Sequence, residues 1–366
     1  MSENFEFVLN EKTFAKMLEL KKEMGYEDKE WDVWLDFICN RQLKKTSQNE
    51  IEQIMEKANY DVWYNKWISN FSLNLNKIWN ESSARDLSPK ELMLEKNNSV
   101  IVIGRGPSIK EQGHLELLAK SDYTGSIMCC DGALKNALQA GVTPDKFPKF
   151  YVSTIDAGDN IKEFYDDEIV DKYGSKIKGI FATVSSPLVV ERARAAGIKI
   201  HWLHALFDYH EGKKSFNQIS ALMVRSKNHV NGLPGIQTGG NIGTSSWFIG
   251  WQILKCSTVA LIGINHSWNE NDSWETILSH GHGLSKVEID KSSTTFKKLF
   301  PKVYNPEFNC YCILDPIFQY YSNALKEFIS RSPLWVKTVN STEGGCIFGE
   351  RIECMKFNDF LQKYKN

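Results

Sequence analysis

Histidine side chains stand in one polar stretch of this sequence where they could perform acid–base chemistry. His280 and His282 lie within Ser279-His-Gly-His-Gly283, and His266 precedes them. An imidazole titrates near neutral pH, so either histidine of the polar stretch could deprotonate an acceptor hydroxyl. The spacing of the three histidines matches none of the common zinc patterns. A solvated loop or a pH-sensitive contact is the alternative to catalysis.

Aspartates follow two of the short apolar runs and could take part in binding a charged ligand. Asp131 follows the run 126–130, and Asp156 and Asp159 follow the run 150–155. The last two could hold Mg²⁺ through one or two carboxylates together with the phosphates of a substrate. Aspartate is also a common turn residue, so capping of the following turns is the alternative for Asp131 and Asp156.

A glycine-containing turn follows the β-branched run 100–103 and precedes a segment with helical spacing. The turn reads Gly104-Arg-Gly106-Pro-Ser108. Glycines let a backbone approach a ligand closely, and we expect Ser108 to cap the next helix, whose amides would attract a nucleotide phosphate. Ile109 replaces the third glycine of the dinucleotide fingerprint, and no Gly-Lys-Ser/Thr follows, which disfavours an NAD enzyme or a P-loop kinase. A structural β–α turn is the alternative.

A glycine pair, Gly239-Gly240, opens a predicted helix over 241–254. Two glycines at a helix entrance are costly unless the backbone must approach another group closely. We expect that group to be a ligand phosphate at the helix N-terminus, and another strand is the alternative.

Strands and helices alternate from Ser99 onward, which predicts an α/β fold: a Rossmann-like, mostly parallel, doubly wound sheet. Ligands of such sheets bind at the carboxyl ends of the strands. The predicted strands are 100–103, 126–130, 150–155, 179–183, 199–203 and 258–262, with a late or edge strand at 335–339, and predicted helices include 134–140, 188–196, 316–329 and 357–361.

The first hundred residues differ in character, because apolar side chains recur there at three- and four-residue intervals typical of amphipathic helices. The pattern from Trp63 to Trp79 predicts one long helix. We therefore predict an N-terminal α-helical domain over 1–95. Its tryptophan-rich helices would contact the rest of the chain or a second subunit, which makes a homo-oligomer an open expectation.

Composition excludes several classes of protein. The chain has 366 residues, 42% of them hydrophobic, and a formal net charge of −1, so neither nucleic acid nor a membrane surface is an expected partner. No apolar run reaches the length of a membrane span, and the first residues do not read as a signal peptide, so we expect a cytoplasmic protein. The eight cysteines lack metal or redox spacing, and we expect buried thiols.

Several motifs occur in an order that resembles the MptE-like family, which includes archaeal 6-hydroxymethylpterin diphosphokinases and the central domain of Maf flagellin glycosyltransferases. The resemblance covers roughly residues 98–282, and Ser-Thr-Glu-Gly-Gly345 resembles a C-terminal turn of Maf proteins. The motifs are Gly104-x-Gly-Pro-Ser108, Asp131-Gly-Ala, Gly141-Val-Thr-Pro-Asp145, Ser153-x-x-Asp156, Gly239-Gly-Asn-x-Gly-Thr244 and Gly263-Ile-Asn-His266.

The Maf resemblance implies a glycosyltransferase that moves a nonulosonic-acid-type sugar from a CMP-sugar to a hydroxyl of a small molecule or a protein. His282 and His280 are then the candidate bases. The residues expected to hold the nucleotide are Gly104, Gly106, Ser108, Asp131, Gly239, Gly240, Asn241 and Thr244.

The pterin kinase resemblance implies a different reaction, the Mg²⁺-dependent transfer of a diphosphoryl group from ATP to a 6-hydroxymethyl-7,8-dihydropterin. Asp156 would then be catalytic, and Asp156 with Asp159 would bind the metal. A nucleotide-binding scaffold without catalysis is the third hypothesis. We expect the transferase domain to span 96–285 and a C-terminal extension, beginning with a mobile polar loop near 286–302, to span 286–366.

Overall fold

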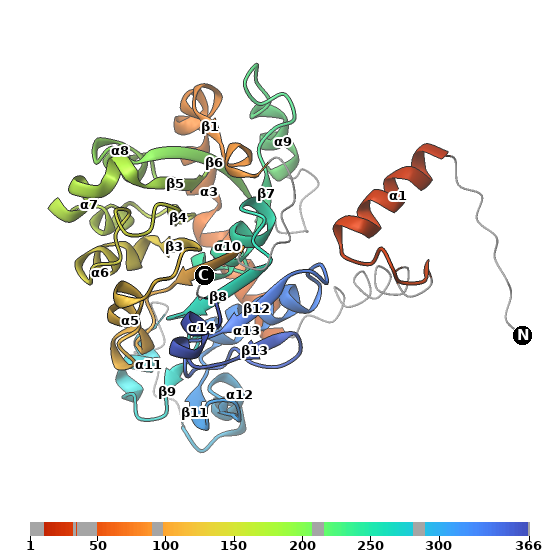
Figure 1. Ribbon diagram of the computed structural model, residues 1–366. Coiled ribbons are helices and arrows are strands. Elements are labelled where there is room, and N and C mark those ends of the chain that lie inside the picture. Colours follow the sequence, from red (N-terminus) through yellow and green to blue (C-terminus); the bar gives the residue numbers. More distant parts are fainter. Residues whose placement is uncertain are drawn as a thin grey trace, which may run out of the picture.

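The computed structural model describes residues 11–31, 34, 50–89, 98–206, 216–280 and 290–364. Its centre is a parallel sheet in the order β1-β6-β5-β4-β3-β2-β8-β12-β13, with β7 paired to β6 (Figure 1). The strands are β1 (Ser82–Ser83), β2 (Ser99–Ile103), β3 (Ser126–Cys130), β4 (Phe150–Thr154), β5 (Lys178–Ala182), β6 (Lys199–Leu206), β7 (Gly235–Gln237), β8 (Thr258–Ile262), β12 (Lys337–Asn340) and β13 (Ile352–Cys354). The predicted α/β class is confirmed.

Continuous apolar runs form the middle of the sheet because these strands are covered on both faces. All residues of β2, β3, β4 and β8 are buried. The predicted late strand, β12, is an inner strand, since it pairs with both β8 and β13.

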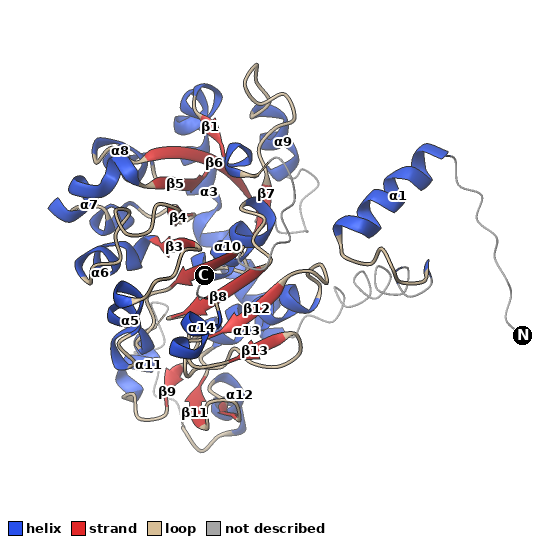
Figure 2. Cartoon of the chain, in the orientation of Figure 1, coloured by secondary structure: helices blue, strands red, loops and turns tan. Residues whose placement is uncertain are grey.

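Most of the helices lie around this sheet, whereas α1 lies apart from it, as the cartoon in Figure 2 shows. The helices of the described residues are α1 (Glu11–Glu23), α3 (Glu50–Asn80), α4 (Ser108–Glu111), α5 (His114–Lys120), α6 (Leu134–Gln139), α7 (Glu168–Tyr173), α8 (Pro187–Ala195), α9 (Phe216–Met223), α10 (Ile242–Phe248), α11 (Trp274–Ser279), α12 (Thr294–Leu299), α13 (Pro316–Ser330) and α14 (Phe357–Lys363). Short 3₁₀ turns are η2 (Ala84–Leu87), η3 (Asp131–Ala133), η4 (Asp159–Phe164) and η5 (Gly174–Lys176), and η6 (Ile249–Ile253) is a π-helical turn that continues α10.

The long helix α3 belongs to the same hydrophobic core as the sheet. Its Phe71 and Ile78 are buried in that core. Two asparagines one turn apart on α3 donate to backbone carbonyls at the carboxyl ends of β4 and β5: Asn70 to Ala157 and Val184, and Asn74 to Thr183 and Ser185. The domain limit predicted at residue 95 stays a prediction. However, α3 precedes this limit and packs against strands that follow it.

Helix α1 and the turn that follows it form a separate small cluster around Met24, Tyr26 and Trp34. Two hydrogen bonds join this cluster to the segment before β12: Leu334 N donates to Met24 O at 2.8 Å, and Trp335 Nε1 donates to Glu23 O at 2.7 Å.

A second, antiparallel sheet lies beside the first in the C-terminal part of the chain. It has the order β10 (Lys302–Asn305), β11 (Cys310–Ile313) and β9 (Trp268–Asn269). Helices α11 and α12 share a small core with it, formed by Ile277, Phe296, Phe300 and Ile313. The expectation of a mobile loop near 286–302 is therefore wrong for 294–299, where Ser293 caps α12 and Phe296 is buried. Residues 286–289 lie outside the described residues.

None of the helices in the described ranges combines the length and the apolar character needed to cross a bilayer.

Candidate functional site

The strand order places a topological switch point between β2 and β8. From β2 the chain proceeds through β3, β4, β5 and β6 on one side, and it then returns to add β8 and β12 on the other side. In open α/β sheets such a reversal opens a crevice at the carboxyl ends of the strands. The loops after β2, β3, β4 and β8 are therefore the walls of the candidate site.

The loop after β2 turns against the loop after β8. Gly104 N donates to Ile262 O and Gly106 N donates to Gly263 O, both at 2.8 Å. A Cβ on Gly106 would lie 2.1 Å from Asn265 Oδ1, and one on Gly104 would lie 2.3 Å from Gly263 O. These two glycines thus allow two backbones to approach each other, and their own amides are already bonded.

Ser108 does not cap a helix as expected. It is the first residue of the four-residue helix α4, whose N-cap is Pro107 without a side-chain cap. The buried Ser108 Oγ donates to Asn265 Oδ1 at 3.0 Å, which ties the loop after β2 to the loop after β8.

Gly239 and Gly240 have positive φ angles of 54° and 78°. A Cβ on Gly240 would lie 2.4 Å from Tyr320 Cε1 and 2.7 Å from Tyr321 Cε1, so the turn is pressed against α13. Asn241 caps α10, because its Oδ1 accepts from Thr244 N at 2.9 Å and its Nδ2 donates to Thr244 Oγ1 at 3.0 Å. The close neighbour that the glycine pair requires is a helix of the same chain.

Asp131 is a buried carboxyl at the end of β3, and burial raises its pKa from 3.8 to about 7. Its Oδ1 accepts from Gly132 N at 2.7 Å. Hydrogen bonds from Gly132 and Thr154 and the charge of Arg105 oppose the increase, whereas the charge of Asp156 adds to it. Asp131 therefore titrates near neutral pH, in electrostatic contact with Asp156 and Arg105.

The predicted metal pair, Asp156 and Asp159, follows β4, and each carboxylate has partners of its own. Asp156 is exposed, and its Oδ1 accepts from Gly158 N at 2.7 Å in the turn after β4. Asp159 forms an ion pair with Lys66 of α3 at 2.8 Å and accepts from Ser186 Oγ at 2.5 Å, which together lower its pKa. The described residues contain no group of three or more His, Cys, Asp or Glu side chains suited to a metal ion.

His280 follows α11 and contacts a buried carboxylate that the sequence reasoning missed. Its Nδ1 lies 2.5 Å from Asp315 Oδ2, and the same oxygen accepts from Trp268 Nε1 at 2.8 Å. The His280 side chain is 30% exposed, whereas that of Asp315 is 2% exposed. His282 lies outside the described residues.

Helix α13 connects this histidine to the switch point. Burial raises the pKa of Tyr321 of α13 to about 12, and the negative charges of Asp156 and Asp315 add to this increase. The ring of His266 lies 5.9 Å from that of Tyr321. Burial, followed by the charge of Lys326, lowers the pKa of His266 to about 3, so this histidine is neutral and a poor base at neutral pH.

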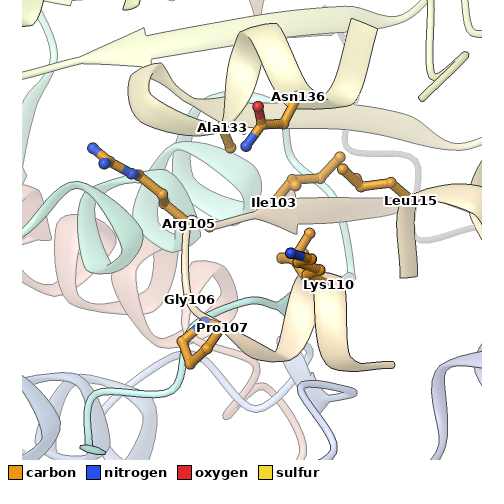
Figure 3. A pocket seen from close by; sticks show the side chains of 10 residues that line it. Ile103, Arg105, Gly106, Pro107, Lys110, Leu115, Ala133 and Asn136 are labelled. Atoms are coloured by element: carbon orange, nitrogen blue, oxygen red, sulfur yellow. The ribbon is translucent and has the colours of Figure 1, made fainter. Parts of the chain in front are cut away.

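A pocket of about 140 Å³ opens between the loop after β2 and the first turn after β3. Figure 3 shows Asn136 and Lys110 on facing walls, Ile103 and Leu115 at one end, and Arg105 at the other. This volume is smaller than the roughly 300–1,000 Å³ of a whole small-molecule site, so it suits a phosphate or a ring. Two cationic side chains at its rim favour an anion.

Comparisons with known proteins give two findings. A family model described as 6-hydroxymethylpterin diphosphokinase MptE-like matches residues 69–271. Among solved structures, the chain is similar to a Maf glycosyltransferase from Magnetospirillum magneticum AMB-1, with 14% sequence identity and a TM-score of 0.47. That alignment covers 79% of this chain and 41% of the other, so the chain spans about two fifths of that protein. No curated protein matches the chain.

The family match begins inside α3 and includes the switch point with the loops after β2, β3, β4 and β8. It covers more than half of the 366 residues. The chain therefore belongs to the MptE-like family.

Proposed function

We propose that this protein is a transferase that moves a glycosyl group, of the nonulosonic-acid type, from a CMP-activated donor to an acceptor hydroxyl. The observation that carries the proposal is the His280–Asp315 pair, which supplies a base without a metal. The charge of Asp315 and that of Asp156, in the loop after β4, both act on Tyr321 of α13. Family membership supports a transferase, and the Thr-Glu-Gly-Gly turn after β12 resembles Maf proteins.

The donor phosphate would lie near the pocket beside Gly104 and Gly106, where Arg105 and Lys110 offset its negative charge. In the reaction, the bond between the anomeric carbon and the phosphate oxygen breaks, and CMP leaves with the electron pair. The acceptor oxygen forms the new bond to that carbon, while its proton moves to Nε2 of His280. Asp131, which titrates near neutral pH, lies close enough to Arg105 to tune the charge beside the phosphate.

Diphosphoryl transfer to a hydroxymethylpterin is the second candidate. The family description and the electrostatic contact between Asp131 and Asp156 favour it. The engagement of Asp159 with Lys66 and Ser186 counts against it, because the predicted two-carboxylate cation site then loses one member.

Calorimetric titration with CMP, cytidine and ATP, each with and without Mg²⁺, tests the proposal. We expect CMP to bind without Mg²⁺ and more tightly than cytidine. The Lys110→Ala variant should lose about tenfold in CMP affinity, as expected for one charged hydrogen bond, and should keep its cytidine affinity. Lys120→Ala is the matched control, because Lys120 is an exposed lysine at the far end of α5.

Other outcomes would redirect the proposal. Tight ATP binding that requires Mg²⁺, with no binding of CMP, would replace glycosyl transfer by diphosphoryl transfer. Binding of neither nucleotide would favour the scaffold hypothesis.

A further inference from the structure

Asp315 accepts three hydrogen bonds from three different parts of the chain. Its Oδ1 accepts from Phe318 N at 2.7 Å, which caps α13. Its Oδ2 accepts from Trp268 Nε1 at 2.8 Å and lies 2.5 Å from His280 Nδ1. A carboxylate has no proton to donate, and an indole N–H and a backbone N–H can only donate. His280 must therefore present a proton on Nδ1.

The ring of His280 is held in place by aromatic side chains as well as by this bond. Its centroid lies 4.7 Å from that of Phe318 and 5.3 Å from that of Trp268, with the latter ring perpendicular to it. A flip of the imidazole would exchange the bonded nitrogen for a carbon and leave the buried Asp315 oxygen short of a donor. Packing and hydrogen bonding thus favour the same orientation.

We infer that Asp315 is a positioning residue that holds His280 as the Nδ1–H tautomer, so that Nε2 keeps its lone pair for the acceptor hydroxyl. The inference rests on the proposed function for the identity of the proton that Nε2 accepts. The fixed tautomer itself follows from the contacts of Asp315 alone.

The substitution Asp315→Asn separates this role from helix capping. Asparagine is as good an N-cap as aspartate, so its oxygen can keep the bond from Phe318 N. With that oxygen on Phe318 N, the amide nitrogen takes the place of Oδ2: it donates to His280 Nδ1, which forces the proton onto Nε2, and it leaves Trp268 Nε1 without its acceptor. We expect the tautomer to invert and kcat to fall about 10²- to 10⁴-fold, with little change in KM for the acceptor.

Nitrogen NMR of histidine-labelled protein reads the tautomer directly and needs no substrate. The signal of His280 is assigned from its absence in His280→Gln. Asp167→Asn is the matched control, because Asp167 caps α7 by accepting from Ile169 N and contacts no histidine among the described residues. We expect that control to keep the wild-type tautomer and the wild-type kcat.

Two results would overturn the inference: a wild-type His280 protonated on Nε2, or an unchanged tautomer in Asp315→Asn. An unchanged kcat in Asp315→Asn, after the tautomer has inverted, would also overturn it, because the tautomer would then be irrelevant to transfer. Failure of the proposed function has a different signature, since the wild-type protein would show the Nδ1–H tautomer but would bind no CMP.

Discussion

Burial of one carboxyl, Asp131, links the chemistry of the site to the stability of the fold. Desolvation raises its pKa to about 7 in the folded protein, from 3.8 for the free side chain. An acid with a raised pKa in the folded state stabilises the fold below pH 4, and this contribution is lost as the pH rises through about 7. The ionised form at pH 8 is therefore unfavourable in the folded state.

Asp131→Asn should remove that dependence on pH, because asparagine keeps an acceptor for Gly132 N and carries no charge. The difference in free energy of unfolding between the variant and wild type should be larger at pH 8 than at pH 5, in favour of the variant, by about 2–3 kcal/mol. Urea denaturation at the two pH values measures this difference. Asp61→Asn, on the exposed surface of α3, is the control and should show no such gain. An equal effect of Asp131→Asn at both pH values would contradict the raised pKa.

The residue types of the sequence indicate which loops lie at the switch point. They do not indicate which groups those loops contact, and the group beside Gly240, predicted to be a ligand phosphate, is a helix of the same chain. A glycine pattern indicates that another group lies close to the backbone, but it does not identify that group. Gly106 faces Asn265 and Gly240 faces Tyr320, and both neighbours are more than 75 residues away in the chain. Asp315 had a local signal, since an aspartate before Pro316 is typical of a helix N-cap. Its bond to His280 depends on tertiary structure and could not be read from the sequence.

At the scale of elements, α3 shows how a polar helix face completes the carboxyl edge of the sheet. The loops after β4 and β5 leave carbonyl groups without strand partners, and Asn70 and Asn74 supply their donors. Lys66, one turn earlier, pairs with Asp159 in the loop after β4. This side of the edge is therefore closed by α3, which leaves the region near β2 and β8 for a ligand.

Asn70→Ala should destabilise the fold by about 2–4 kcal/mol, because the carbonyls of Ala157 and Val184 would stay buried without a donor. Chemical denaturation measures the change in the free energy of unfolding. Asn76→Ala is the matched control on the exposed face of the same helix, and we expect it to change stability by less than about 0.5 kcal/mol. Equal effects of the two substitutions would show that helix propensity, and not the carbonyl bonds, dominates.

The central strands were predictable because each is a continuous apolar run that is buried on both faces. The run 258–262 coincides with β8 and the run 126–130 with β3. The small sheet of β9, β10 and β11 was not predicted, because these strands are short and partly exposed, and β9 pairs with β11 across more than 30 residues. The helix expected over 241–254 changes to a π-helical turn at Ile249. There, Gly250 packs so close to the sheet that a Cβ would lie 2.8 Å from Val100 Cγ1.

At the scale of the whole molecule, the N-terminal region divides into two parts with different attachments. The cluster around Met24, Tyr26 and Trp34 is joined to the segment before β12 by two backbone-acceptor hydrogen bonds and the close approach of Gly25 to Leu334. Helix α3, in contrast, contributes Phe71 and Ile78 to the main core. The family match starts at residue 69, within α3. A helical domain that ends at residue 95 would combine these two unlike parts.

Two truncations test that division. Removal of residues 1–49 should leave a chain that unfolds cooperatively, with a Tm lower by a few degrees and an unchanged affinity for CMP, because the switch point and α3 are intact. Removal of residues 1–95 also takes away Phe71 and Ile78, at about 1.5–3 kcal/mol each, and the four asparagine bonds, at about 1 kcal/mol each. That loss is comparable to the whole net stability of a typical domain, about 5–15 kcal/mol, so we expect this shorter chain not to fold.

Calorimetry measures the Tm of both truncated chains, and near-UV circular dichroism shows whether each one has fixed tertiary structure. A 96–366 chain that folds with the full Tm would restore residue 95 as the boundary and would mean that α3 only covers a sheet that is stable without it.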